Sequence, residues 1–332
     1  MLWLVPHLFV DARLLDVATP GLRLPGLQTL LARGIVMPRE PAIGTEAAVC
    51  RALGIAQQRD WPLAPMTLEM DGGTAGDDYW LRADPVHLHV MRDRIALVEP
   101  RLDDLAHEEA LALAHAVRTH FGEACDPIVA DARRWYLRLA RPLRLDTTPP
   151  SLAAGRAIEA TLPRGEDAAH LKALLNELQM LLHTHPVNQA REARGALPVN
   201  SLWPWGGGTR PIRPEDAPPI YAHQTDCRAA AAWCGALCEI PPNRFDTGMP
   251  ASGVVLLDAL ETPARTGDAL GWREALRQLE CDWFAPLARG LNRLGPANLH
   301  LLDPVHGRSV LLRSADAWKV WRRPRPLSVL SG

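Results

Sequence analysis

Residues 176–208, NELQMLLHTHPVNQAREARGALPVNSLWPWGGG, concentrate the polar side chains that are best suited to binding an anion. His185 and Asn188 lie in a short polar run, and Arg191 and Arg194 follow directly. An arginine suits a phosphate group because its planar fork donates two parallel hydrogen bonds to two oxygens. Arginines in turns can equally be solvent-exposed surface residues. Our chemical hypothesis is a polar cleft on which these four side chains converge.

A helix, a turn and a strand must position these side chains. Pro186 disfavours helical geometry in the residue before it, so we expect a helix to end near His185 and HTHPVN to form a turn. The apolar run LPVNSLWPW predicts a buried strand, and the GGG of residues 206–208 allows a sharp turn or the close approach of a ligand. The apolar stripe of the helix consists of leucines spaced by three and four, at Leu174, Leu175, Leu178, Leu181 and Leu182.

The segment HPVNQAREARGALPVNSLWPWGGG resembles the archaeal-type, cofactor-independent phosphoglycerate mutases, in which a His-Pro-Val-Asn turn precedes an Arg, a Pro-Ala-Asn strand and a Gly-rich end. It is more similar still to bacterial proteins labelled phosphoglycerate mutase or regulatory protein. The resemblance implies the alkaline phosphatase superfamily. Members of that superfamily have an α/β core with a mostly parallel sheet, a smaller inserted domain, two divalent metals and a phosphorylated Ser or Thr.

The resemblance extends to two further arginines. Arg82 in WLRADPVHLHV matches the arginine of the family's Arg-Cys-Asn strand, which helps to hold the phosphorylated substrate. Arg134 stands where the family has a basic residue before its matching strand. With the four residues named above, these arginines make up the predicted substrate-binding set. We expect Arg82 to share one cleft between the domains with Arg191 and Arg194.

Thr45 in PAIGTEAAVCRALGI stands where the family's nucleophilic serine would, in a segment that resembles its Pro-Gly-Ser-Asp loop. A hydroxyl at a helix N-terminus commonly caps the helix by accepting a backbone N–H. A threonine can also carry a phosphoryl group, whose charge the same helix end would stabilise. The sequence leaves both interpretations open, and a nucleophile would still need a metal partner.

The metal ligands that the resemblance requires are incomplete. The opening LWLVPHLFVD lacks the family's Asp-Gly, and Asp11 is the nearest carboxylate. Glu261 can replace an Asp, but Arg265 stands where a metal-binding His belongs, and a fixed positive charge opposes a cation. The family's Asp-His pair is represented by Asp303 and His306. We therefore expect no metal or other cofactor; manganese or zinc is expected only if these residues and the threonine assemble a variant site.

The order of the predicted elements indicates two domains. Residues 1–75 and 200–332 contain alternating buried strands and helices, which predicts one α/β core. Within it, strand 2–10 should share a sheet with strand 253–260. Residues 76–199 contain their own strands and two helices, as expected of a smaller α+β inserted domain.

The composition indicates a globular protein, because 47% of the 332 residues are hydrophobic. We find no apolar run of about 18 residues, and MLWLVPHLF is too short for a signal or a span. We therefore expect a cytoplasmic protein with no membrane partner. The six cysteines lack the paired spacing of a disulfide framework, so buried free thiols are expected.

The charge is nearly balanced, with 36 basic and 38 acidic residues and a net charge of −2. This balance offers no general electrostatic footprint for nucleic acid, so we expect no nucleic-acid partner. Only the end, WKVWRRPRP, is locally basic, and we interpret it as a solvated tail with snorkelling arginines. A nucleic-acid-binding regulator is a third functional class that rests on this tail alone.

Loss of both cations should cost many powers of ten in the rate of phosphoryl transfer, because that reaction depends on positioning and electrostatic stabilisation. We therefore expect a degenerate relative of phosphoglycerate mutase that binds a phosphorylated or carboxylated small molecule, has little or no catalysis, and acts on a regulatory protein partner. The alternative is an active, metal-dependent 2,3-bisphosphoglycerate-independent phosphoglycerate mutase, which converts 3-phosphoglycerate to 2-phosphoglycerate.

Overall fold

The structure is a computed structural model, and it describes residues 1–90, 95–98, 102–139, 141–245, 252–291 and 298–327. The chain divides into two compact units. The first comprises Met1–Leu53 and Glu215–Gly332, and the second comprises Gly54–Pro214.

The first unit is built on a sheet in which seven described strands follow the order β11-β10-β12-β1-β13-β14-β2. The strands are β1 (Leu2–Leu4), β2 (Ile35–Val36), β10 (Ile220–Tyr221), β11 (Cys238–Glu239), β12 (Val254–Leu256), β13 (Leu299–Asp303) and β14 (Arg308–Leu312). The strands from β11 to β13 in this order are parallel, whereas β14 pairs antiparallel with both β13 and β2. The predicted α/β class with a mostly parallel sheet is confirmed, and β1 pairs with β12 as expected.

The opening strand is shorter than predicted, because β1 ends at Leu4 and not at residue 10. Pro6 lies two residues beyond Leu4 and has no N–H to donate to a sheet. The chain then turns, and His7 adopts a φ of 59°, a value that non-glycine residues rarely have. This turn places His7 just beyond the carboxyl end of β1.

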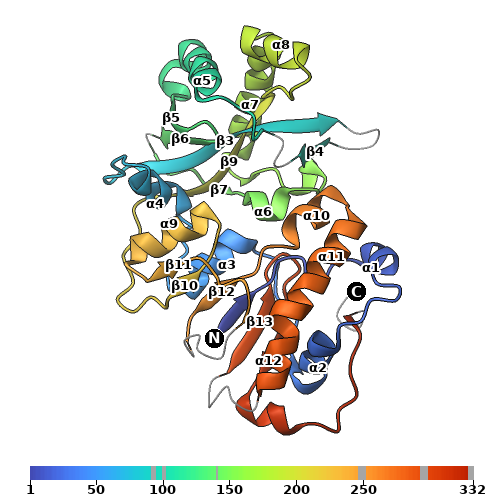
Figure 1. Cartoon of the computed structure of the whole chain (residues 1–332). Coiled ribbons are helices and arrows are strands. Elements are labelled where there is room, and N and C mark those ends of the chain that lie inside the picture. The colour runs from blue at the N-terminus through green and yellow to red at the C-terminus, as the bar shows by residue number, and fades with distance from the viewer. Residues whose placement is uncertain (91–94, 99–101, 140, 246–251, 292–297, 328–332) are drawn as a thin grey trace. The chain divides into compact units, whose positions relative to one another are not determined.

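Helices cover both faces of this sheet (Figure 1). They are α1 (Ala12–Ala18), α2 (Pro25–Arg33), α3 (Thr45–Ala52), α9 (Thr225–Cys234), α10 (Glu261–Thr266), α11 (Ala269–Leu279) and α12 (Ala285–Gly290). On one face, Trp3 belongs to a core that includes Leu27 of α2, Trp272 of α11 and Leu287 of α12. Helices α3 and α9 pack together on the other face. A π-helical turn, Glu280–Phe284, joins α11 to α12.

The second unit is built around β3, a long strand that pairs antiparallel with β4, β6 and β9. Its strands are β3 (Tyr79–Val90), β4 (Ile95–Val98), β5 (Pro127–Asp131), β6 (Arg134–Leu139), β7 (Leu145–Asp146), β8 (Arg164–Gly165) and β9 (Ser201–Gly208). Its helices are α4 (Leu63–Met70), α5 (His107–Phe121), α6 (Pro150–Ala153), α7 (Ala168–His183) and α8 (Pro186–Ala193).

Side chains alternate between the two faces of β3, as they must in any strand. Leu81 and Ala83 belong to the core that contains α5 and α7. Trp80 belongs to a separate cluster on the opposite face, where it lies with Tyr136 of β6 and Leu68 of α4. The sheet therefore separates two environments within the second unit.

The boundaries of the two units differ from the predicted domains 1–75, 200–332 and 76–199. Helix α4 packs on β3 and β9, and β9 pairs with β3 over much of its length, so both elements belong to the second unit. The second unit is consequently nearly as long as the first. Burial of α4 against the antiparallel sheet explains the difference.

The glycine run of β9 is required by close packing. A β-carbon on Gly207 would lie 2.5 Å from Tyr79 Oη, and one on Gly208 would lie 2.6 Å from Pro62 Cβ. Gly206 has a φ of 66°, which L side chains rarely adopt. The run that we predicted as a turn or the edge of a site is thus part of the strand, and neighbouring side chains occupy the space beside it.

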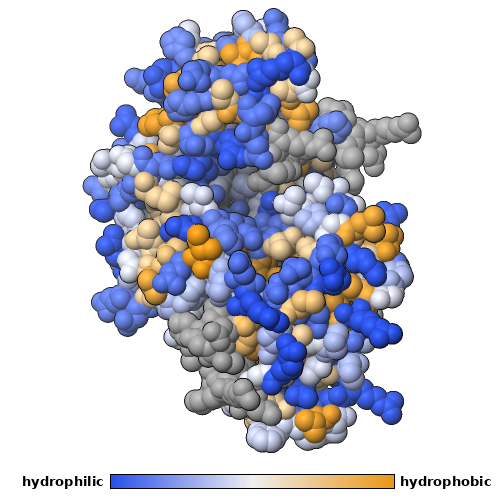
Figure 2. Space-filling model, viewed as in Figure 1, coloured by the Kyte–Doolittle hydropathy of each residue, from blue (hydrophilic) through white to orange (hydrophobic). Residues whose placement is uncertain are grey.

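The surface shown in Figure 2 is mainly hydrophilic, with small groups of hydrophobic residues between the polar ones. Across the ranges described above, no helix is long and apolar enough to cross a bilayer.

Candidate functional site

The carboxyl ends of the parallel strands in the first unit gather the polar residues of the candidate site. Gln224 follows β10, Glu261 follows β12, His7 follows β1 and Asp303 ends β13. In α/β sheets, ligands bind outside the carboxyl ends of the strands. This edge is therefore where the predicted catalytic and metal positions can be examined.

Thr45 is the first residue of α3 and is fully buried, with 0% of its surface exposed. The N-cap residue is Gly44, whose N–H donates to Pro304 O at 3.2 Å in the loop after β13. Thr45 Oγ1 donates to Glu261 Oε1 at 2.7 Å. Thr45 is therefore not the N-cap residue, because Gly44 occupies that position. The Thr45 hydroxyl instead contacts a carboxylate from another part of the chain.

Glu261 is buried and accepts hydrogen bonds on both carboxylate oxygens. Besides Thr45, its donors are Gln224 Nε2 at 2.9 Å and Arg265 Nη2 at 3.1 Å. Arg265 lies one turn later on α10, and its side chain is also mostly buried. A guanidinium held this close opposes binding of a metal ion by the same carboxylate.

Asp303 is fully buried and organises two loops through its carboxylate. The N–H groups of His7 and Phe9 donate to it at 3.2 and 2.9 Å, and that of Val305 at 3.0 Å. His306 Nδ1 lies 2.9 Å from Asp303 Oδ2. Burial alone raises the pKa of this carboxyl, but the contact with His306 and the N–H of Phe9 outweigh it, so the pKa lies below the usual value.

His7 and His306 face each other at this edge, with ring centroids 5.5 Å apart in an edge-to-face arrangement. Among the described residues, His7 is the non-glycine residue with a positive φ. Unusual backbone geometry often lies at functional sites. The turn after β1 is held in place by Asp303, which the sequence analysis associated with a metal.

The predicted metal positions do not fit a manganese or zinc ion. Asp11 caps α1 by accepting from Leu14 N at 2.9 Å, and it is exposed. Glu261 and Asp303 are occupied by the donors described above. Within the parts of the chain that the structure describes, we find no group of three or more His, Cys, Asp or Glu residues that could hold a metal.

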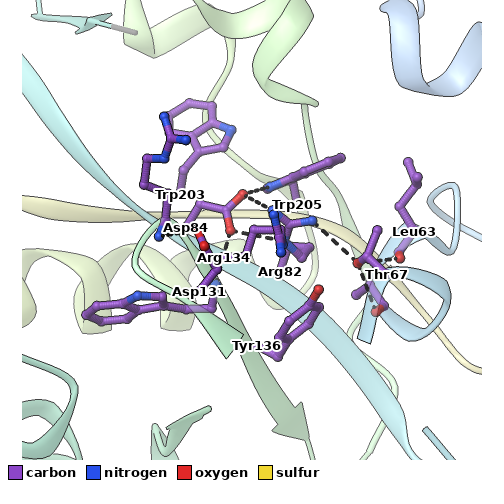
Figure 3. A network of polar contacts seen from close by, with 12 residues as sticks. Leu63, Thr67, Arg82, Asp84, Asp131, Arg134, Tyr136, Trp203 and Trp205 are labelled. Atoms are coloured by element: carbon purple, nitrogen blue, oxygen red, sulfur yellow. Dashed lines mark hydrogen bonds and ion pairs between the residues drawn. The ribbon is translucent and has the colours of Figure 1, made fainter. Parts of the chain in front are cut away.

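In the second unit, Arg82 forms a buried network that Figure 3 shows in detail. Its Nε and Nη2 donate to the two oxygens of Asp84 at 3.0 and 2.8 Å. Its guanidinium lies 4.9 Å from the Trp205 ring centroid, and Trp205 Nε1 donates to Asp84 at 2.7 Å. Arg82 Nη1 lies 3.4 Å from Thr67 Oγ1. With only 2% of its surface exposed, Arg82 is a structural arginine.

Arg134 forms a second two-pronged pair, with Asp71 at the end of α4. Its Nε and Nη2 donate to the carboxylate at 3.0 and 2.8 Å. Tyr136 Oη donates to the same carboxylate at 2.7 Å, and burial raises the pKa of this phenol. The Arg134 side chain is 25% exposed, so unlike Arg82 it remains accessible to a solute.

Arg191 and Arg194 both contact Glu109 of α5. Arg191 is 0% exposed and donates to Glu109 at 2.7 Å, to Asp104 at 2.7 Å and to Leu197 O at 2.8 Å. Arg194 donates to both oxygens of Glu109 at 2.9 and 3.2 Å. Although partial burial raises the pKa of Glu109, the hydrogen bonds from Arg194, Ala106 and Arg191 lower it to about 2.

His185 and Asn188 position α8. The segment predicted as a turn is the start of this helix, because proline is well tolerated at the first helical position. His185 is the N-cap residue, and its Nδ1 accepts from Val187 N at 3.2 Å. Asn188 is buried and bonds to the backbone of Leu182 and Val199, which fastens α8 to the end of α7 and to the segment before β9.

The predicted binding residues do not converge on one cleft. Arg82 lies on the face of β3 that packs against α4, whereas Val187 of α8 packs against the core that includes Leu81 and Ala83 on the other face. Arg191 and Arg194 share Glu109, but Arg82 lies across the sheet from them. Strand alternation is the physical reason.

The residues that sequence reasoning missed are the carboxylates that bind these arginines. Asp84 lies two residues after Arg82, so strand alternation puts both on one face, and that signal was available in the sequence. Asp71, Asp104 and Glu109 are distant from their arginines in sequence, and no local pattern indicates them.

Comparison with known proteins relates this chain to a family. The 2,3-bisphosphoglycerate-independent phosphoglycerate mutase of Methanothrix thermoacetophila is 30% identical over 190 residues, which are 50% of this chain and 48% of that protein. A probable 2,3-bisphosphoglycerate-independent phosphoglycerate mutase of Geobacter sulfurreducens is 39% identical over 152 residues, 45% of this chain and 38% of that protein. This chain is a relative of the cofactor-independent phosphoglycerate mutases.

The matched segments span about half the length, or less, of these phosphoglycerate mutases. No family model matches the chain. A solved structure of a cofactor-independent phosphoglycerate mutase from Thermoplasma acidophilum DSM 1728 is 18% identical, covers 100% of this chain and 94% of that chain, and has a TM-score of 0.47.

Proposed function

We propose that this relative of the phosphoglycerate mutases binds a phosphorylated or carboxylated small molecule in a regulatory role and has little or no phosphoryl-transfer activity. The observation that carries the proposal is the buried cluster of Thr45, Glu261 and Arg265. The hydroxyl at the nucleophile position is enclosed, and its carboxylate partner is neutralised by a guanidinium. In-line attack on a phosphate requires an accessible oxygen, which this arrangement withholds.

The arrangement also lacks a means of stabilising the transition state. Divalent cations normally neutralise the developing charge on the transferring oxygens. Here the carboxylates at the strand edge bind donors of the chain itself, at Glu261 and Asp303. Binding of an anion is less demanding than its transfer, because it needs charge and shape but no activated nucleophile.

Two of the predicted arginines are suited to such binding. The side chain of Arg194 is exposed and that of Arg134 is partly exposed, whereas Arg82 and Arg191 are buried in ion pairs. A phosphate or carboxylate ligand would exchange with Asp71 at Arg134 or with Glu109 at Arg194. We expect a protein partner to sense the bound ligand.

Titration calorimetry with 3-phosphoglycerate tests this proposal. The full chain should bind the ligand, and Arg134→Gln or Arg194→Gln should weaken binding at least tenfold, since a hydrogen bond to a charged group contributes about 1.5–3 kcal/mol. Arg138→Gln, which removes an exposed arginine paired with Asp78, is the matched control and should change nothing. Absence of binding, or equal binding by all three variants, would contradict the proposal.

A second candidate is an active mutase that uses manganese or zinc. The observation in its favour is the 2.7 Å bond from Thr45 Oγ1 to Glu261, because a carboxylate in contact with a hydroxyl is the arrangement that activates a nucleophile. It requires Arg265 to leave the carboxylate and α3 to expose Thr45.

A further inference from the structure

The basic end of the chain is exposed to solvent, as the sequence suggested, but it is held to the first unit and is not a free tail. Ala317 and Leu327 are buried in the core of that unit. Arg33 Nη1 of α2 donates to Ala317 O at 3.0 Å, and Arg325 N donates to Gln28 O at 3.3 Å. The red end of the ribbon runs beside α2 in Figure 1. The intervening segment is therefore held at both ends.

Between these two anchors, three apolar side chains within four residues are exposed to solvent. Trp318 is 68% exposed, Val320 is 69% exposed and Trp321 is 73% exposed. Tryptophan is costly to leave in water because of its large apolar ring, and neighbouring exposed apolar residues commonly mark an interaction site. A segment fixed at both ends loses little conformational freedom when it binds, so its docking is favoured.

The charge around these residues is positive. Arg323 and Arg325 are exposed, and so is Arg322, which also donates to Ala32 O of α2. Residues 318–325 contain no Asp or Glu, and Asp316, just before the first anchor, is buried and bonded to Lys319 at 2.5 Å. The accessible charge of the segment is thus contributed by arginines.

We infer that residues 318–325, the Trp-Arg loop, dock the protein on an anionic lipid bilayer. Tryptophan rings favour the headgroup region, and arginines beside them attract anionic headgroups. The whole chain carries a net charge of −2, so its overall charge does not favour an anionic surface and the attraction depends on local groups such as these arginines. The sequence analysis expected no membrane partner; the loop fits contact with a bilayer surface and not a span across it.

An aliphatic residue in the loop favours lipid over nucleic acid. Val320 is as exposed as the two tryptophans that flank it. Single-stranded nucleic acid binds through flat aromatic rings and a groove of positive charge, and an aliphatic side chain adds nothing to stacking. In a bilayer, the same side chain buries apolar surface alongside the rings.

Sedimentation with lipid vesicles tests the inference on the full chain. Vesicles of equal parts phosphatidylglycerol and phosphatidylcholine should bind the protein, vesicles of phosphatidylcholine alone should not, and added salt should weaken binding because it screens the arginines. Arg323→Gln with Arg325→Gln should weaken binding about 25-fold, since each arginine near an anionic surface contributes about 1 kcal/mol, or roughly fivefold. Trp318→Ala with Trp321→Ala should also release the protein.

The matched control is Arg138→Gln with Arg144→Gln, which removes two exposed charges from the second unit and should leave vesicle binding unchanged. Thermal unfolding of each variant checks that the fold is retained. Equal binding to both kinds of vesicle, or full binding by the tryptophan variant, overturns the inference. Binding to single-stranded oligothymidine without binding to vesicles also overturns it and assigns the loop to nucleic acid.

Discussion

Thr45 and Arg265 are bound to opposite oxygens of one carboxylate. Thr45 Oγ1 lies 2.7 Å from Glu261 Oε1, and Arg265 Nη2 lies 3.1 Å from Glu261 Oε2. The residue at the nucleophile position therefore shares its partner with a cation that the chain itself supplies. This buried cluster joins the start of α3 to α10 and takes the place of an accessible hydroxyl.

Arg265→Gln should destabilise the protein, because it leaves the buried Glu261 carboxylate without its cation. Removing one partner of a buried ion pair costs about 3–5 kcal/mol. Chemical denaturation should therefore show a loss of about 3 kcal/mol in the free energy of unfolding. Arg277→Gln, which breaks an exposed pair with Glu274, should change this free energy by less than about 1 kcal/mol. Equal effects of the two substitutions would show that Arg265 is not needed to neutralise Glu261.

Asp60 should make stability depend on pH. It is buried and accepts from Thr147 N at 2.9 Å and Thr147 Oγ1 at 2.5 Å, but desolvation dominates and raises its pKa from 3.8 to about 6. Because the folded-state pKa is raised, this carboxyl contributes stability that is full below pH 4 and is lost as the pH rises through 6. The two-unit shift corresponds to about 3 kcal/mol.

Asp60→Asn removes this titration and retains an oxygen that can accept from Thr147. The free energy of unfolding, measured by urea denaturation from pH 4 to pH 8, should fall with pH more steeply in the parent than in the variant. Between pH 4 and pH 8, the difference in the free energy of unfolding between the two proteins should change by about 3 kcal/mol in favour of the variant. Parallel pH profiles would mean that Asp60 titrates normally.

Gly207→Ala should destabilise the second unit, because the added methyl group would lie 2.5 Å from Tyr79 Oη. Overpacking of this kind costs about 1–3 kcal/mol. Tyr79→Phe removes the oxygen that the methyl group meets, so the double variant should recover part of the loss. Thermal unfolding of the single and double variants measures this recovery. A single variant as stable as the parent would show that the glycine is not required by packing.

Much of the fold could be predicted because apolar periodicity is local. The pairing of β1 with β12 followed from buried apolar runs, and helix α7 followed from leucines spaced by three and four. Helix α7 ends at His183, close to the predicted end near His185, but the start of α8 was missed because Pro186 also begins a helix. Helix α4 was assigned to the wrong unit because its packing partners, β3 and β9, are remote in sequence.

The candidate site was harder to predict because its contacts are long-range. The motifs identified Thr45, Glu261 and Arg265 as candidate site positions. They did not predict that the three side chains contact one another in one buried cluster. The arginines predicted to hold a ligand have carboxylate partners from other elements, such as Glu109 for Arg191. Sequence spacing shows which side chains can bind an anion and does not show which of them the chain already uses.

Turnover of 3-phosphoglycerate to 2-phosphoglycerate is the measurement that tests the central claim most directly. The assay is coupled to removal of 2-phosphoglycerate, with manganese or zinc added, and is run on the parent, Thr45→Ser and Thr45→Val. Valine matches threonine in shape without the hydroxyl, and serine keeps the hydroxyl. We predict no turnover above the background of the coupling enzymes in any of the three. Turnover that the parent and Thr45→Ser share and that Thr45→Val abolishes would contradict the account and establish an active mutase.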